Sequence, residues 1–299
     1  SAGALCATDQ LPVPGSEDLV ARAVLLSPPV LDAAHREALG ERWAQALADR
    51  AGGWDALRAA PVDQVVGLGE ALLGDPAFAG TRGGALPMIH PATLPAGPAD
   101  AARARTGVDV LLGTTADEGA FFFRAAGRRP EPDADGLRAM VAHLPGVEDA
   151  DAESARWRTI LGPETDTNTL LVRIGGEALV ERPATRWAAQ RAQAGGRVHR
   201  LRVDHAAPDP DLGALHSVDV PLLFGTYDDG GAGTPMAGDT PRAAEVSAAL
   251  RGAVGAFARG EDPGWPAREA SGDGAVAVFG GPGDVPPMRV AAPATQSVS

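Results

Sequence analysis

Short apolar runs separated by long helical stretches constrain the fold of this chain more than any other feature of its sequence. The first run is stopped by Pro28-Pro29, and proline cannot continue a central strand because it has no amide donor. Buried strands are predicted over residues 24–26, 108–112, 198–203 and 275–279. Strands that alternate with helices favour the α/β class, with a mostly parallel central sheet and helices on both faces.

The segments between these runs have the spacing of amphipathic helices. Pro183 and Pro241 lie in the first turns of two of them. Proline is tolerated there because the amides of the first turn have no acceptor within the helix. Thr240 is a good N-cap. Helices are predicted over residues 31–50, 61–73, 137–143, 154–161, 183–194 and 241–260. Residues 80–106 are rich in Gly, Pro and Ala without periodicity and predict a long connection, and a loose tail is expected after residue 279.

Composition excludes several classes of protein. At 299 residues, with 44% hydrophobic and 22% charged residues, the chain is long enough for one large core and is not a disordered protein. No apolar run approaches the roughly 18 residues of a membrane span. A net charge of −13 repels a nucleic-acid backbone, so the expected partner is a small neutral molecule. Cys6, the single cysteine, cannot form an intrachain disulfide.

Two residues with catalytic chemistry follow predicted strands. Glu118 comes six positions after residue 112, and His216 comes 13 positions after residue 203. Functional groups of open α/β sheets gather at the carboxyl ends of the strands, so the two side chains are expected to meet there. A carboxylate beside a histidine fixes the imidazole tautomer and stabilises the imidazolium, which makes the pair a base and its orienter.

The first residue supplies a candidate nucleophile. Ser1-Ala2-Gly3 matches the second half of a Gly-x-Ser-x-Gly elbow, in which the serine lies on a tight strand-to-helix turn. Three residues alone are a weak signal. The order along the chain adds weight, because α/β-hydrolases run serine, then acid, then histidine, and here these residues stand at positions 1, 118 and 216.

Four blocks of the sequence resemble, in order, the type B carboxylesterase family, the α/β-hydrolases that include cholinesterases and bacterial carboxylesterases. The blocks are an elbow tail with the strand after it, an acidic segment carrying Asp-Glu-Gly before aromatic residues, a histidine block, and a C-terminal Phe-Ala and Trp-Pro signature. They span residues 1–4 with 21–27, 113–123, 212–226 and 257–266.

The resemblance implies a serine esterase mechanism without metal or organic cofactor. By position, Ser1 would be the nucleophile, Glu118 the triad acid and His216 the general base, acting through an acyl-serine intermediate. Glu118 is preferred to Asp117 because the acid of the family motif is its second residue. The Ala2 amide would be one oxyanion-hole donor, and the substrate would be a small-molecule ester.

The resemblance also implies what lies around these residues. Phe121 and Phe122 fall where the family lines its substrate pocket. The family has early sheet strands and a Gly-rich oxyanion loop before the elbow, and neither is in this sequence. Residues 1–299 therefore resemble the C-terminal portion of one carboxylesterase domain, a partial α/β-hydrolase fold whose N-terminal strands are missing and which an N-terminal segment or companion fragment would complete.

Three other interpretations use different residues. An N-terminal serine whose own amine serves as the base would make the chain an amidohydrolase. A non-catalytic, esterase-like binding module would need no triad, although all three residue types are present. A metal site could be built from acidic residues and histidines in one loop, although their spacing fits no standard ligand pattern. Those residues are Asp204, His205, Asp209, Asp211 and His216.

Overall fold

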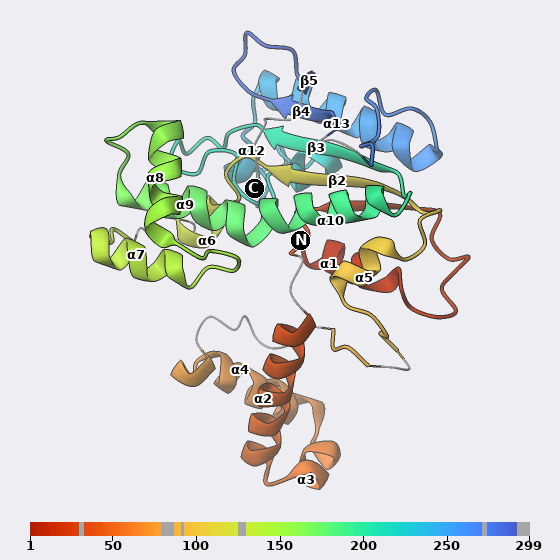
Figure 1. Ribbon diagram of the computed structural model, residues 1–299, viewed down its shortest axis with the longest axis vertical. Coiled ribbons are helices and arrows are strands. Elements are labelled where there is room, and N and C mark those ends of the chain that lie inside the picture. Colours follow the sequence, from red (N-terminus) through yellow and green to blue (C-terminus); the bar gives the residue numbers. More distant parts are fainter. Residues whose placement is uncertain (30–32, 79–86, 91–92, 125–129, 271–273, 292–299) are drawn as a thin grey trace.

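A five-stranded sheet forms the centre of the protein (Figure 1). The computed structural model describes residues 1–29, 33–78, 87–90, 93–124, 130–270 and 274–291. The strands lie side by side in chain order, the first four parallel and the fifth antiparallel. They are β1 (Arg22–Leu26), β2 (Asp109–Thr115), β3 (Val198–Asp204), β4 (Val276–Gly280) and β5 (Met288–Ala291). The four predicted strands and the mostly parallel sheet are confirmed.

Strand β5 corrects the prediction of a loose tail after residue 279. Phe279 of β4 pairs with Met288 of β5, after a turn that Gly280 and Gly281 enter with positive φ angles of 99° and 97°. Arg289 fixes the new strand by donating to the Gly280 carbonyl at 2.8 Å. A four-residue strand behind two prolines has too weak a local signal to be predicted, because its stability comes from the neighbouring strand.

Helices cover both faces of the sheet, as predicted. On one face α13 (Pro241–Arg259) packs Phe257 against Leu201 and Val203 of β3. On the other face lie α1 (Ala2–Gln10), α5 (Pro98–Arg103) and α10 (Arg182–Gln193). Trp187 of α10 belongs there to the same buried cluster as Val198. Alternate residues of β3 thus enter the two cores, which is the expected pattern for a strand buried on both sides.

Further helices complete the described structure (Figure 1). Asp133, Asp149 and Asp166 cap three of them by accepting backbone N–H groups of the first turn. The further helices are α2 (Ala33–Ala51), α3 (Trp54–Ala59), α4 (Val62–Leu73), α6 (Glu118–Phe123), α7 (Ala134–Ala142), α8 (Ala150–Leu161), α9 (Thr167–Gly176), α11 (Asp219–Phe224) and α12 (Thr234–Ala237). Within the described residues, no helix is long and apolar enough to cross a membrane.

All six predicted helices are present, but the sequence did not reveal α1, α3, α5, α6, α9, α11 or α12. Helix α5 interrupts the predicted connection 80–106, of which residues 80–86 and 91–92 lie outside the described part. Helix α9 is buried over most of its length and continues through a π-helical turn, Glu177–Glu181, into α10. Thr167 to Thr169 at its start and Gly175 and Gly176 at its end are weak helix formers, so the local signal for α9 is poor.

Arg191 ties the connection before β2 to α10. Its side chain is fully buried and its guanidinium donates to the carbonyls of Ala104 at 3.0 Å, Arg105 at 2.8 Å and Val108 at 2.6 Å, with a longer bond to Ala102 at 3.4 Å. The carbonyls of the segment before β2 are therefore satisfied by one arginine side chain rather than by the backbone amides of a helix or strand.

Candidate active site

Glu118 and His216 meet at the carboxyl ends of the parallel strands, as predicted. Glu118 is the first residue of α6, three residues after β2 ends, and His216 lies in the loop between β3 and α11. The His216 Nδ1 atom is 2.5 Å from Glu118 Oε2. Only 2% of Glu118 and 3% of His216 are exposed, so the hydrogen bond is shielded from competing water.

The other carboxylate oxygen of Glu118 is held by two further donors. The Thr115 amide donates to Oε1 at 2.7 Å, and the Ser27 hydroxyl donates to the same atom at 2.6 Å. Each oxygen of the carboxylate thus has a fixed partner, which sets the plane in which it faces His216. With Glu118 accepting, Nδ1 carries the imidazole proton and Nε2 is the free basic nitrogen.

Ser27 is a site residue that the sequence did not reveal. It follows β1 directly and has a φ of 47°, a left-handed conformation that is uncommon outside glycine. Ser217, beside the histidine, has a φ of 72°. Backbone strain of this kind gathers at functional sites. The available signal was position alone, since Ser27 stands at a strand's carboxyl end like the other two residues.

Phe121 and Phe122 lie against the imidazole. Their ring centroids are 5.5 Å and 5.1 Å from that of His216, and 5.5 Å from each other. Phe121 is 44% exposed, so one wall of the site is apolar and open to solvent. The predicted substrate-binding pair is thus next to the predicted base, in a position where an apolar group could contact both.

Ser1 is the exposed N-cap of α1, and its carbonyl accepts the first bond of that helix from Leu5 at 2.9 Å. The Ser1 nitrogen lies near the buried carboxyl of Asp219, which stands three residues after His216. Between the described Ser1 and His216 the structure has no hydrogen bond.

Asp219 is a second buried acid that the sequence did not single out. It is 2% exposed, and burial raises the pKa of its carboxyl to about 6, with the negative charge of Glu118 adding to the rise. His216 acts in the opposite direction. The site therefore contains two neighbouring carboxyl groups in different surroundings, of which Glu118 is held by hydrogen bonds and Asp219 is penalised by burial.

Replacing Asp219 with asparagine is expected to change how stability depends on pH. Folding raises the pKa of Asp219 from 3.8 to about 6, so its ionised form is disfavoured in the folded protein and stability falls as pH rises from 3.8 through 6. Asp219→Asn removes that effect. Urea unfolding should find the variant about 2–3 kcal/mol more stable than wild type at about pH 8 and equal to it at about pH 3, below both pKa values.

Asp228, an exposed acid, provides the matched control for that experiment. Asp228→Asn should leave both unfolding free energies unchanged, because an exposed carboxyl has no burial penalty to lose. If Asp219→Asn raised the free energy of unfolding equally at both pH values, the raised pKa of Asp219 would be contradicted.

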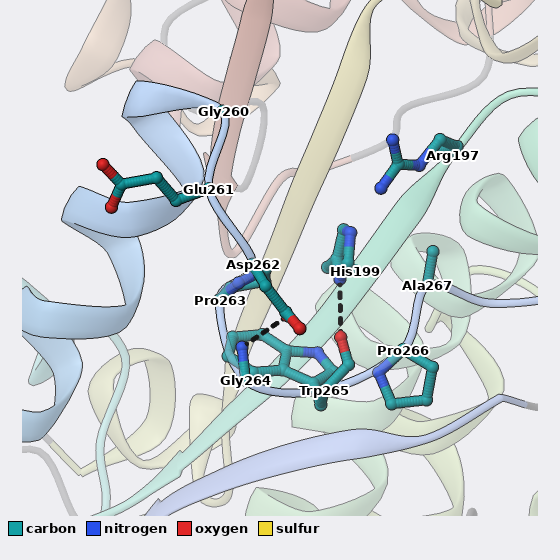
Figure 2. Close-up of a pocket in the computed structure, with 10 residues that line it drawn as sticks. All are labelled: Arg197, His199, Gly260, Glu261, Asp262, Pro263, Gly264, Trp265, Pro266 and Ala267. Atoms are coloured by element: carbon teal, nitrogen blue, oxygen red, sulfur yellow. Dashed lines mark hydrogen bonds between the residues drawn. The ribbon is translucent and has the colours of Figure 1, made fainter.

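A hollow of about 550 Å³ lies at the other end of the sheet (Figure 2). It is formed by the start of β3 and the loop after α13. Its lining residues are Arg197, His199 and 260–267. His199 Nδ1 donates to the Trp265 carbonyl at 3.0 Å, and burial lowers the pKa of His199. None of the predicted site residues borders this hollow, since parallel strands place their two ends at opposite edges.

The loop after β3 does not assemble the alternative metal site. His205 Nε2 bonds the Ala237 carbonyl at 2.7 Å, and Asp204 accepts from Arg202 at 2.6 Å and from Arg289 at 3.0 Å. Throughout the part of the chain that the structure describes, no three His, Cys, Asp or Glu side chains gather as metal ligands. Asp204, His205 and His216, three of the five residues of the metal interpretation, each bind other protein groups instead.

Comparisons with known proteins agree with the α/β fold. Phenmedipham hydrolase of Pseudarthrobacter oxydans is 28% identical over 282 residues, which are 90% of this chain and 56% of that protein. A pNB esterase structure aligns with a TM-score of 0.73 at 20% identity, and a carboxylesterase of Geobacillus stearothermophilus with 0.76 at 23%. Each alignment covers 97% of this chain and 59% or 60% of the solved one.

The chain thus spans a little over half the length of the relatives it matches. The profile of the carboxylesterase family matches residues 1–271, which is most of the sequence and includes every predicted site residue. The chain belongs to the carboxylesterase family.

Proposed function

We propose that this chain carries the nucleophile, acid and base of a serine carboxylesterase, with Ser1, Glu118 and His216 as the triad. The observation that carries the proposal is the buried contact of 2.5 Å between His216 Nδ1 and Glu118 Oε2 at the carboxyl ends of the strands. Membership of the carboxylesterase family supports the same reaction class. The relatives named above are a hydrolase and esterases.

The reaction would proceed through an acyl-serine. His216 Nε2 takes the proton of the Ser1 hydroxyl as Oγ attacks the ester carbonyl, and returns it to the leaving alcohol when the tetrahedral intermediate collapses. Water activated by the same nitrogen then releases the acid and frees the serine. Glu118 stabilises the imidazolium of both steps, which its three hydrogen bonds prepare it to do.

Helix α1 offers a donor for the oxyanion. The first intrahelical bond runs from the Leu5 amide to the Ser1 carbonyl, so the Ala2 amide at the start of the helix has no partner within it. An amide in that position can donate to an oxyanion formed next to Ser1, where each donor contributes on the order of a hundredfold to rate. Phe121 and Phe122 would shape the pocket for an apolar part of a small-molecule ester.

The sheet has room for a further partner. Strand β1 is at one edge of the sheet, and about 40% of each solved relative lies outside the aligned part. We infer that residues 1–299 are the C-terminal portion of one domain and that an N-terminal segment or companion fragment pairs beside β1. That segment would supply the remaining oxyanion donors.

Labelling with a fluorophosphonate probe, followed by peptide mapping, tests this function. Such reagents react with a serine only when a base activates it, so the label is expected on Ser1 and should be lost in His216→Ala and Ser1→Ala. The experiment is run on the 299-residue chain and on the full reading frame that encodes it. Label that survives His216→Ala would favour the N-terminal amidohydrolase, and no label in either protein would favour the binding module.

A further inference from the structure

We propose that Asp117 is a positioning residue that joins the loop of the acid to the loop of the base and sets the distance between Glu118 and His216. The proposal rests on the function proposed above. It assigns a role to the first acid of the Asp-Glu-Gly motif, whose second acid is Glu118.

Asp117 departs from what an aspartate does at its position. It is the N-cap of α6, where an aspartate side chain normally accepts an amide of the first turn. Here the side chain makes no such bond. Its carboxylate is turned instead toward the histidine loop, although Glu118, the next residue, starts the helix. The helix gives up a stabilising cap, which is unexplained unless the carboxylate acts elsewhere.

The carboxylate binds the histidine loop together with its own backbone. Asp117 Oδ2 accepts the Ala214 amide at 2.9 Å, and the Asp117 amide donates to the Ala214 carbonyl at 2.9 Å. Ala214 lies two residues before His216, and an isolated parallel bridge pairs Asp117 with Leu215. Two bonds in opposite directions between the same two residues fix the spacing of the loops and their relative rotation.

Gly213 makes this close approach possible. It has a φ of 54°, and a Cβ atom at this position would lie 2.4 Å from Asp117 Oδ2. A side chain there would displace the carboxylate or the loop. The histidine loop is therefore shaped to admit this one carboxylate, in a conformation that glycine adopts readily.

Arg173 of α9 holds the other side of the carboxylate. Its Nη1 atom is 2.8 Å from Asp117 Oδ1 and 3.2 Å from the Ala116 carbonyl. The Asp117 side chain is 18% exposed and that of Arg173 is 32% exposed, so the pair is partly shielded. Arg173 thus fixes the rotation of the carboxylate, and Asp117 links three elements: α9, the acid loop and the histidine loop.

The effect on catalysis follows from the short contact at the centre. The two loops carry the atoms that are 2.5 Å apart, and a displacement of about 1 Å in such an arrangement lowers rate on the order of a hundredfold. Asp117 touches neither the ester nor the reacting atoms in this proposal. Its loss should therefore alter the orientation of His216 and leave substrate binding intact.

Asp117→Asn tests the proposal, because an amide keeps the size of the side chain but has one acceptor for two donors. Ester hydrolysis by the full reading frame should show kcat lowered about 10- to 100-fold, with KM within about twofold of wild type. Arg173→Met should lower kcat less, since the bonds to Ala214 remain. The double variant should be no worse than Asp117→Asn alone, because both substitutions act through one ion pair.

Asp151→Asn is the matched control. It removes the ion pair of Asp151 with Arg138, at 2.9 Å on the exposed side of α8, and should leave kcat and KM unchanged. An unchanged kcat in Asp117→Asn, or a loss that appears wholly in KM, would overturn the proposal. Arg173→Met provides the same test if Asp117→Asn fails to fold.

A spectroscopic measurement separates this proposal from the proposed function. The proton between His216 Nδ1 and Glu118 gives a downfield NMR resonance whenever the short bond is intact, whether or not an ester is hydrolysed. Asp117→Asn should shift or broaden that resonance, and Asp151→Asn should not. If the wild-type protein hydrolyses no ester, the proposed function fails, and an unaltered resonance in Asp117→Asn would independently defeat the positioning role.

Discussion

His216→Ala should lower kcat for hydrolysis of a short-chain nitrophenyl ester by about 10⁴- to 10⁶-fold and leave KM nearly unchanged. In the proposed mechanism the imidazole takes and returns the serine proton, and its Nδ1 is already bonded to Glu118 at 2.5 Å. Without it the hydroxyl stays protonated at neutral pH, where it is a poor nucleophile. Steady-state rates of the full reading frame, wild type and variant, provide the measurement.

The matched control for that experiment is His143, an exposed histidine at the end of α7. His143→Ala should retain full activity. Combining His216→Ala with Glu118→Gln should add little to the loss, because residues that act as one unit are not additive. A tenfold loss or less in His216→Ala, or a loss confined to KM, would mean that another group is the base.

Arg191→Met should lower the free energy of unfolding by at least about 3 kcal/mol. The guanidinium donates to four carbonyls of the segment 102–108, and methionine would leave those acceptors buried without donors. No carboxylate of the described residues is hydrogen-bonded to Arg191, and burial lowers its pKa. Arg191 therefore stabilises the fold through hydrogen bonds to carbonyls rather than through an ion pair. The measurement is urea unfolding followed by circular dichroism.

Arg186, an exposed arginine on the same helix, is the control for Arg191. Arg186→Met should change stability by less than about 0.5 kcal/mol, as surface substitutions usually do. Arg191→Lys should fall between the two variants, since an ammonium cannot reach four carbonyls at once. Equal stability of Arg191→Met and Arg186→Met would show that the carbonyls find other partners.

The sequence was most informative where a local pattern decides the structure. Uninterrupted apolar runs marked four strands, and position after a strand was enough to predict that Glu118 and His216 meet. Ser27 shows where this reasoning ends. It stands directly before two prolines and resembles a strand terminator, and its partner Glu118 is 91 residues away. Nothing local indicates that the hydroxyl turns toward an acid from another loop.

Asp117 and Asp219 show the same limit for charged residues. Glu118 was preferred to Asp117 because the second acid of the motif aligns with the triad acid of the family. The motif does not indicate what its first acid binds. Asp219 follows His216 in sequence and could equally have been a solvated loop residue. Burial and side-chain direction separate these cases, and both depend on how distant segments pack.

The order of the parallel strands determines when the site can form during folding. The Ser27–Glu118 and Glu118–His216 contacts join residues 91 and 98 positions apart. The first contact needs β1 beside β2 and the second needs β2 beside β3, and non-local pairings of this kind are slow to assemble. A slip of one residue between β1 and β2 would also turn Ser27 to the opposite face. The Ser27–Glu118–His216 contacts are thus a late product of folding, and they form only when the strands are in register.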